Sequence, residues 1–199
     1  MRIGFLGAGG IGQALAGHIA KAGYEVVVSN SRGAASLADV ASRLGPLAKA
    51  GTREEAARAD VVVLAVQWPQ LQSALTGLPA WEGRILIDAT NPVTGPGMRT
   101  VDLSGSTSSE IVASLAPGAR VVKAGNTLLR AVLAADPQEA GGRRVLFMSG
   151  DDAAAKLEVR GVLERSGFAM VDLGGLASGG KLQQFPGGPL PTLNLIKLG

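Results

Sequence analysis

A glycine-rich turn near the start of the chain follows a short apolar run, Ile3 to Leu6, and precedes a helical pattern that opens at Gly10. The turn has the spacing GxGxxG at Gly7, Gly9 and Gly12. In a strand–turn–helix unit the first glycine permits the tight turn, the second admits phosphate groups to the backbone, and the third lets the helix pack closely against the sheet. The helix start adds unpaired N–H groups and positive dipole charge. The pattern therefore predicts a site for the pyrophosphate of a dinucleotide.

The end of the second predicted strand, Glu25 to Ser29, indicates which dinucleotide binds. NAD-binding sites place an acidic residue about 20 residues beyond the glycines, where it accepts hydrogen bonds from the adenine ribose. This chain instead continues with Asn30, Ser31 and Arg32 and has no acid before Asp39. A hydroxyl and a guanidinium bind a 2′-phosphate that a carboxylate would repel. We predict NADP as the cofactor; the alternative is a solvated polar turn that merely holds an arginine.

Further candidate residues follow the ends of other predicted strands. Asp60 to Val66, Arg84 to Asp88 and Arg120 to Ala124 are apolar runs of the kind that form buried parallel strands. Because the carboxyl ends of such strands share the ligand-binding edge of a sheet, residues at those ends are candidates to meet the ribose and nicotinamide. These candidates are Ala65, Val66, Gln67, Trp68, Thr90 and Asn91. For Trp68, a loop residue that covers the core is an equally good interpretation.

The residues that could donate protons or hold a metal have simpler interpretations. His18, the only histidine, falls within the first helix and beyond the turn that faces the phosphates, so we expect it to pack. Lys123 is the only lysine near a strand's carboxyl end, and we expect a structural or phosphate-facing role. Asp151 and Asp152 stand side by side without a third ligand nearby, so one of them is expected to cap the following helix. No metal site is predicted.

These residues need a framework that brings strand ends together. Apolar runs alternate with helical patterns from the first residues to Leu173, which predicts an α/β Rossmann fold with a doubly wound, mostly parallel sheet. Helices are predicted from Ala34 to Leu44, from Ser108 to Leu115 and from Thr127 to Ala135, and the capping-box pattern of Thr52 and Glu55 predicts a further helix start. The stretch Val93 to Thr107 is rich in Gly, Ser and Thr and is predicted to be a mobile loop over the site.

The last part of the chain is predicted to be an appendage. Residues 1–175 are assigned to the NADP-binding domain and residues 176–199 to a small C-terminal helical extension. Leu193, Leu195 and Leu198 give this extension more apolar surface than a free tail should expose. We therefore expect it to dock on its own domain or on a second copy, and we predict a homodimer.

Composition limits the classes of function. The 199 residues are 46% hydrophobic and only 4% aromatic, so we expect a core of ordinary size with mainly aliphatic packing. The net charge of +3 comes from dispersed basic residues, and no aromatic–basic pattern supports nucleic-acid binding. The chain has no cysteine, which excludes disulfides and thiolate–metal sites. No apolar run reaches about 18 residues and the first strand begins at once, so we expect a cytoplasmic protein that binds no membrane.

Several motifs together resemble a known family, the NADPH-dependent reductases of the deazaflavin coenzyme factor 420. The chain is similar also to the cytosolic NADPH-binding domain of membrane ferric reductases. The motifs are Gly7–Gly12, Ser29–Arg32, Ala65–Trp68, Asp88–Pro92, Val122–Thr127, Ser149–Asp152 and Leu182–Gln184. The resemblance covers essentially the whole chain. It implies a compact Rossmann domain, often paired as a homodimer, that transfers hydride from NADPH to a flat ring.

The motifs and the resemblance together assign residues to the cofactor. The predicted cofactor-binding residues are Gly7, Gly9, Gly10, Ile11, Gly12, Ser29, Asn30, Ser31, Arg32, Ala65, Val66, Gln67, Trp68, Asn91 and Ala124. Asn91, Ala124 and Asn126 would border the hydride-transfer position, and no residue is assigned as an acid or base. The family usually carries an aromatic or other bulky residue before Asn126, whereas this chain has Gly125, which predicts a more open pocket.

Hydride transfer between stacked rings needs little acid–base help, which suits a chain without a convincing general acid. We predict an NADP-dependent oxidoreductase acting on a small-molecule ring acceptor such as a deazaflavin or flavin. Two alternatives stay open. A small imine or keto-acid reductase would need a further helical domain of about a hundred residues, for which little chain follows Leu173. A non-catalytic NADPH-binding sensor is favoured by Gly125 and the missing acid–base group.

Overall fold

The computed structural model describes residues 1–199. The strands are β1 (Arg2–Leu6), β2 (Glu25–Ser29), β3 (Ala48–Ala50), β4 (Val61–Leu64), β5 (Ile85–Asp88), β6 (Val93–Thr94), β7 (Arg99–Thr100), β8 (Arg120–Ala124), β9 (Gln138–Glu139), β10 (Gly142–Gly150), β11 (Ala169–Asp172) and β12 (Ile196–Leu198). The helices are α1 (Gly10–Lys21), α2 (Ala38–Leu44), α3 (Arg53–Ala57), α4 (Leu71–Leu75), α5 (Ser108–Leu115), α6 (Arg130–Ala134), α7 (Ala153–Arg165) and α8 (Leu176–Gln183). No helix combines the length and apolar character needed to cross a membrane.

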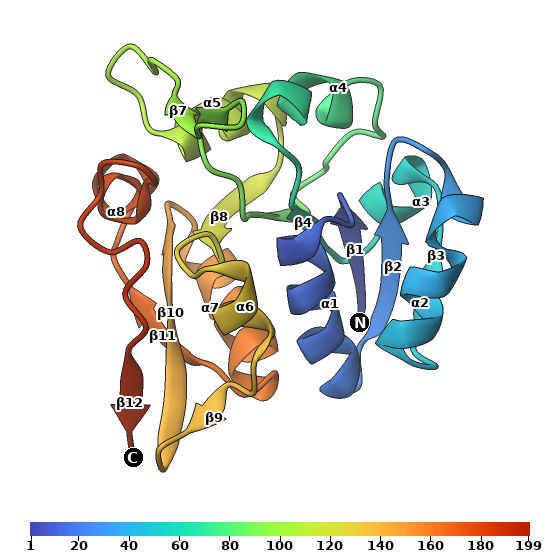
Figure 1. The fold of residues 1–199 in the computed structure, drawn as a ribbon. Coiled ribbons are helices and arrows are strands. Elements are labelled where there is room, and N and C mark those ends of the chain that lie inside the picture. Colours follow the sequence, from blue (N-terminus) through green and yellow to red (C-terminus); the bar gives the residue numbers. More distant parts are fainter.

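The sheet has the strand order β3-β2-β1-β4-β5-β8-β10-β11, with helices on both faces (Figure 1). The first six strands of this order run parallel to one another. Strand β10 is antiparallel to β8, and β11 runs parallel to β10. The chain order reverses at β1, so that β2 and β3 lie on one side of it and β4 and β5 on the other. The predicted α/β Rossmann fold with a doubly wound, mostly parallel sheet is confirmed.

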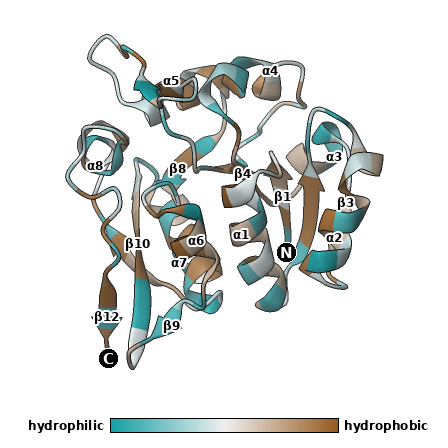
Figure 2. Cartoon of the chain, in the orientation of Figure 1, coloured by the Kyte–Doolittle hydropathy of each residue, from teal (hydrophilic) through white to brown (hydrophobic).

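Each face of the sheet carries its own apolar core, because successive side chains of a strand point to opposite faces. On one face, Ile3, Phe5 and Val63 pack with side chains of α1, α2, α6 and α7. On the other, Leu6 and Leu64 pack with side chains of α3, α4 and α5. Figure 2 shows β1 and β2 in brown along most of their length. All four residues of β4 are buried, as expected of a central parallel strand.

Side-chain caps explain where several helices begin. The predicted capping box of Thr52 and Glu55 is present at the start of α3. A second box, of Thr107 and Glu110, starts α5 and was not predicted. Asp152 accepts a hydrogen bond from the Ala155 N–H (2.6 Å) and caps α7, which confirms a cap at this pair of aspartates.

Three segments differ from the sequence-based expectation. The helix predicted from Ala34 to Leu44 begins as a 3-10 turn at Ala34–Leu37 before it becomes α2. The helix predicted from Thr127 to Ala135 begins only at Arg130, because Leu129 has an extended backbone (ψ 144°). Within Val93 to Thr107, strands β6 and β7 form a small antiparallel hairpin, since Gly95 and Met98 take positive φ values at its turn.

The C-terminal extension adds a strand as well as a helix. Helix α8 packs on α5 and β10, and β12 pairs antiparallel with the first residues of β10 (Figure 1). The C-terminal extension therefore contacts the rest of the chain through both α8 and β12. Leu193, Leu195 and Leu198 nevertheless remain 41%, 43% and 66% exposed.

Candidate functional site

The glycine turn joins β1 to α1 at the carboxyl edge of the sheet. Gly7 has a φ of 103°, and a Cβ there would lie 2.4 Å from the Ala65 carbonyl oxygen. A Cβ at Gly12 would lie 2.4 Å from the Gly7 carbonyl oxygen, so the turn and the helix touch through their backbones. A Cβ at Gly9 would meet no atom within 4 Å, and the first turn of α1 holds no acidic residue. The open side of the turn can therefore present its N–H groups to an anion.

Ser29 and Asn30 shape the turn that follows β2. The buried Ser29 hydroxyl donates to the Phe5 carbonyl oxygen (2.7 Å), so its proton is used within the sheet. The Asn30 Oδ1 accepts from the Arg32 N–H (2.9 Å) and from the Ser36 hydroxyl (3.2 Å). These bonds close an Asx turn that turns the chain away from the strand. Both side chains thus hold the turn rather than offer free groups to a ligand.

Ser31 and Arg32 are the exposed residues of this turn. The Arg32 guanidinium takes part in none of the hydrogen bonds or ion pairs of the structure. The Gly7 N–H donates to the Ser29 carbonyl oxygen (3.1 Å), which joins the glycine turn directly to the end of β2. The unpaired Arg32 guanidinium follows β2, the strand next to β1 and its glycine turn. It can therefore bind a second phosphate group of the same ligand.

The segment after β4 brings Ala65 beside the glycine turn. Its N–H donates to the Leu6 carbonyl oxygen (2.8 Å). Val66 and Trp68 are partly buried and pack on the apolar core of the α4 face, so Trp68 covers the core as the alternative interpretation expected. Gln67 is exposed and starts the 3-10 turn Trp68–Gln70. Of these predicted residues, Gln67 has the side chain most available to a ligand.

Asn91 and Asn126 bind each other across the ends of β5 and β8. The Asn91 Nδ2 donates to the Asn126 carbonyl oxygen (2.9 Å). The Asn126 Nδ2 donates to the Asn91 Oδ1 (2.9 Å) and to the Gln183 carbonyl oxygen (2.8 Å). Both N–H groups of the Asn126 amide are therefore occupied, whereas Asn91 keeps one N–H for a ligand. Asn126 is arranged to position Asn91.

Gln183, from α8, completes this network and was not assigned a role by the sequence. Its Oε1 accepts from the Ser149 hydroxyl (2.7 Å), and its Nε2 donates to the Phe147 carbonyl oxygen (3.1 Å) and to the Asn126 Oδ1 (3.3 Å). The Leu182–Gln184 motif is its only sequence signal. The C-terminal extension is thus tied to the residues at the carboxyl edge of the sheet.

Lys123 lies below the same edge in a buried ion pair. Its Nζ lies 3.2 Å from the Asp88 Oδ2 and also donates to the Thr90 carbonyl oxygen (3.1 Å) and the Ser108 hydroxyl (3.0 Å). Asp88 and Lys123 are both fully buried. The Asp88 Oδ1 accepts from the Thr90 N–H (2.8 Å) and hydroxyl (2.7 Å). Lys123 is therefore structural, and the hydroxyl of Thr90 is not free.

Ala124 ends β8 and Gly125 follows it, and Gly125 differs from its predicted role. The Ala124 side chain is buried in the α1-side core, so only its backbone can border the site. Gly125 does not open a pocket: a Cβ there would lie 3.0 Å from Leu15 Cδ1, and the residue has a φ of 76°. The glycine serves the backbone turn and the close packing of Leu15 on α1.

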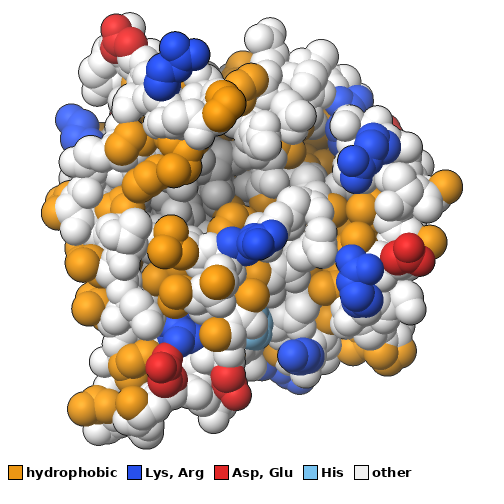
Figure 3. All heavy atoms as spheres, in the orientation of Figure 1, with side chains coloured by type: hydrophobic (Ala, Val, Ile, Leu, Met, Phe, Trp, Pro, Cys, Tyr) orange, Lys and Arg blue, Asp and Glu red, His pale blue; other side chains and the backbone are white.

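Arg130, which the sequence did not single out, lies against the start of α1. A Cβ at Gly10 would lie 2.0 Å from Arg130 Cδ. About 120 residues separate the two positions, and only the packing of α6 beside α1 joins them. Figure 3 shows the surface hollowed between the level of α4 and α5 and that of α1 and α6, with hydrophobic and basic side chains on its rim.

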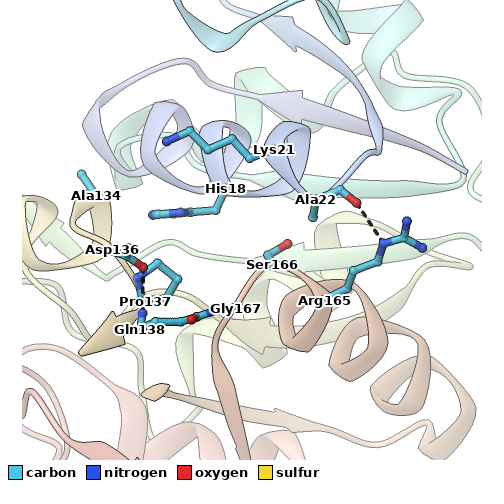
Figure 4. A pocket seen from close by; sticks show the side chains of 10 residues that line it. All are labelled: His18, Lys21, Ala22, Ala134, Asp136, Pro137, Gln138, Arg165, Ser166 and Gly167. Atoms are coloured by element: carbon cyan, nitrogen blue, oxygen red, sulfur yellow. Dashed lines mark hydrogen bonds between the residues drawn. The ribbon is translucent and has the colours of Figure 1, made fainter. Parts of the chain in front are cut away.

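A separate cavity of about 310 Å³ lies at the opposite edge of the sheet (Figure 4). It is lined by His18, Lys21, Asp136, Arg165 and other polar groups around the C-terminal ends of α1 and α7. The His18 ring stacks edge-on against Phe168, with ring centroids 5.2 Å apart. Its Nε2 lies 2.8 Å from the Leu133 carbonyl oxygen. His18 packs, as predicted, and takes no part at the glycine turn.

His18 predicts a pH dependence of stability. Burial lowers the pKa of His18 below its ordinary value of 6.5; Lys21 and Arg144 lower it further, and the Leu133 carbonyl and Asp136 oppose them. The folded state then binds fewer protons than the unfolded state, so stability should fall as the pH drops below 6.5 towards the folded-state pKa. Denaturant unfolding should show that the free energy of unfolding falls less between pH 7.5 and pH 5 for His18→Gln than for the wild type. The glutamine amide can still donate to the Leu133 carbonyl oxygen. An equal loss in both proteins would contradict this.

Comparison with known proteins identifies the family of this chain. The model of the family described as NADP oxidoreductase, coenzyme F420-dependent, matches residues 2–92. A solved structure of a candidate F420-dependent NADP reductase from Arthrobacter is 32% identical and has a TM-score of 0.75, with 88% of this chain and 86% of that chain covered. The motifs that carried the resemblance thus lead to the same family.

Two further proteins are similar along nearly the whole chain. A hypothetical protein from Sinorhizobium meliloti is 46% identical, with a TM-score of 0.91, and the match covers 98% of this chain and 94% of that one. The metalloreductase STEAP3 of Rattus norvegicus is 30% identical over 192 residues, or 96% of this chain. The chain spans 37% of the length of that curated relative.

Proposed function

The chain belongs to the family of coenzyme F420-dependent NADP oxidoreductases, and from this premise we propose that it transfers hydride between NADP(H) and a flat ring acceptor such as a deazaflavin or flavin. The turn after β2 carries the proposal. It combines an exposed, unpaired Arg32 with the absence of any acid between Ser29 and Gly33. That composition suits the 2′-phosphate of NADP and offers no carboxylate to an NAD ribose.

The residues of the carboxyl edge suggest how the cofactor would be held. The N–H groups after Gly9 would bind the pyrophosphate, with Gly10, Ile11 and the start of α1 behind them. Ser31 and Arg32 would bind the 2′-phosphate. When bound, NADPH supplies the hydride.

At the nicotinamide end, Gln67 and the free N–H of Asn91 would orient the ring, together with the backbones of Val66 and Ala124. The two side chains considered above as proton donors, His18 and Lys123, do not reach this end. His18 lies at the opposite edge of the sheet, and the Lys123 ammonium group is buried below the site, where it donates its hydrogen bonds to other residues of the chain. The protein's contribution would therefore be positioning and exclusion of water, which supplies most of the catalysis when two rings stack. A ring acceptor suits such a site better than a substrate that needs a proton from a side chain.

The cofactor preference can be tested with Arg32→Ala. Loss of a charge-assisted bond to the 2′-phosphate should weaken NADPH binding about 10- to 100-fold. NADH binding should hardly change, because NADH lacks that phosphate. Isothermal titration with both dinucleotides measures this, and Arg43→Gln, an exposed arginine at the end of α2, is the matched control. Equal losses for NADPH and NADH would show that the 2′-phosphate is bound elsewhere.

The acceptor can be tested by following NADPH absorbance with a deazaflavin, FMN or a ferric chelate. Turnover with a ring acceptor supports the proposal. Turnover only with imines or keto acids would replace it, and dinucleotide binding without any turnover would favour the sensor.

We further propose that residues 1–175 form the NADP-binding domain and that residues 176–199 serve as an extension in a homodimer. The exposed Leu193, Leu195 and Leu198 support a contact between two copies through this extension.

A further inference from the structure

Arg130 lies directly against the first residue of α1. A Cβ built on Gly10 would lie 2.0 Å from Arg130 Cδ, 2.9 Å from its Cγ and 3.3 Å from its Nε. Real side chains do not approach so closely, so the arginine stem occupies the space that Gly10 leaves free. Gly10 is therefore glycine for a different reason from Gly7 and Gly12, which contact backbone. A side chain at Gly10 would displace the Arg130 stem.

The position gives the Arg130 guanidinium an unusual electrostatic setting. Arg130 is exposed, and its guanidinium takes part in none of the side-chain hydrogen bonds or ion pairs of the structure. The first turn of α1 has no acidic residue, and its N-cap, Gly9, has no side chain to bond the free N–H groups. A guanidinium and the positive end of a helix dipole thus stand side by side without an intervening negative charge. An anion between them would be bound by both.

We propose that Arg130 is a second arginine of the cofactor site and binds the pyrophosphate of the dinucleotide across the glycine turn. This rests on the proposed function and deepens it. The two arginines would bind different phosphate groups of the dinucleotide, since Arg32 follows the end of β2, where the 2′-phosphate is expected. Arg32 selects NADP over NAD, whereas Arg130 strengthens the binding of both, because both carry the pyrophosphate.

The test measures dissociation constants of NADPH and NADH by titration for wild type, Arg130→Gln, Arg130→Lys and Arg32→Ala. Arg130→Gln should weaken both dinucleotides about tenfold or more, with their ratio unchanged. Arg130→Lys should recover part of the loss, since a point charge replaces a bidentate fork. Arg43→Gln should leave both constants unchanged, and thermal unfolding should show that each variant folds.

Gly10→Ala supplies an independent arm. The added methyl group displaces the Arg130 stem, so this variant should also weaken both dinucleotides. In the Arg130→Gln background the same change should weaken binding less, because no guanidinium remains to be displaced from the pyrophosphate. Fully additive effects would mean that Gly10 does not act through Arg130.

Three other outcomes overturn the inference. Unchanged affinity for both dinucleotides in Arg130→Gln would remove Arg130 from the site. A loss for NADPH alone would place it on the 2′-phosphate. Unchanged dinucleotide affinity with a raised KM for the ring acceptor would assign it to an anionic group on the acceptor. If the wild type binds neither dinucleotide, the proposed function itself fails. That result is seen in the wild type, so it is distinct from a failure of the Arg130 inference, which is seen only in the variants.

Discussion

Replacing Lys123 with methionine is expected to lower the free energy of unfolding by about 3–5 kcal/mol, because it leaves the Asp88 carboxylate buried without its cation. Both side chains are fully buried, and their charged atoms are 3.2 Å apart. Methionine matches the length of the lysine stem, so the loss would come from charge and hydrogen bonding rather than from a cavity. The Thr90 carbonyl and the Ser108 hydroxyl would each lose the Lys123 donor. Urea denaturation followed by circular dichroism measures the change.

Lys156→Met is the matched control for this experiment. Lys156 forms a 3.0 Å ion pair with Asp172, but both groups are partly exposed to solvent. Its loss should cost less than about 1 kcal/mol. Since an entire domain is stable by only about 5–15 kcal/mol, the difference between the two variants should be plain. A Lys123→Met protein as stable as the Lys156→Met protein would refute the structural role of the buried pair.

Gly12→Ala is expected to disturb both the fold and the cofactor site. The new methyl group would lie 2.4 Å from the Gly7 carbonyl oxygen, and a backbone oxygen cannot turn aside as a flexible side chain can. Helix α1 would have to move away from the glycine turn. Overpacking of this kind costs about 1–3 kcal/mol of stability. Because the helix start and the turn would no longer converge on the pyrophosphate, we also expect NADPH affinity to fall about tenfold or more.

The same substitution one and a half turns later on α1 provides the control. At Gly17 a Cβ would make an ordinary contact of 3.6 Å with Leu44 Cδ2. Alanine there removes a glycine from a helix interior and should stabilise the protein by about 0.5–1 kcal/mol. NADPH affinity should stay at the wild-type value. Equal stability and equal NADPH affinity of the two variants would show that the close contact at Gly12 matters neither for the fold nor for cofactor binding.

The periodic parts of the fold could be predicted because their signals are local. The strands at Glu25–Ser29 and Arg120–Ala124 and the helix at Ser108–Leu115 lie at their predicted bounds. Each depends on an apolar run or on a cap a few residues away. The predictions were less accurate where backbone conformation opposes the pattern. Thr127 to Leu129 look helical in composition, yet Leu129 is extended and α6 starts only after it.

The sequence also indicated which polar residues lie at the carboxyl edge of the sheet. It did not indicate which of them bind a ligand and which hold the backbone in place. Ser29, Asn30, Thr90 and Asn126 were candidates for ligand contacts. The structure shows instead that their hydrogen bonds hold the strand ends and turns in place. Which polar group is occupied and which is free depends on partners that lie 2 to 57 residues away in the chain.

By itself, the sequence determined the glycine turn, the alternation of strands and helices, and a β2 end without an acid, because each is written in consecutive residues. Only the tertiary structure decided that Arg130 lies on Gly10, that Gln183 reaches Asn126, and that Gly125 packs on Leu15 instead of opening a pocket. The physical reason is the parallel sheet: it gathers the ends of strands that are far apart in the chain at one edge. The contacts made there depend on strand order and helix packing, which no short stretch of sequence encodes.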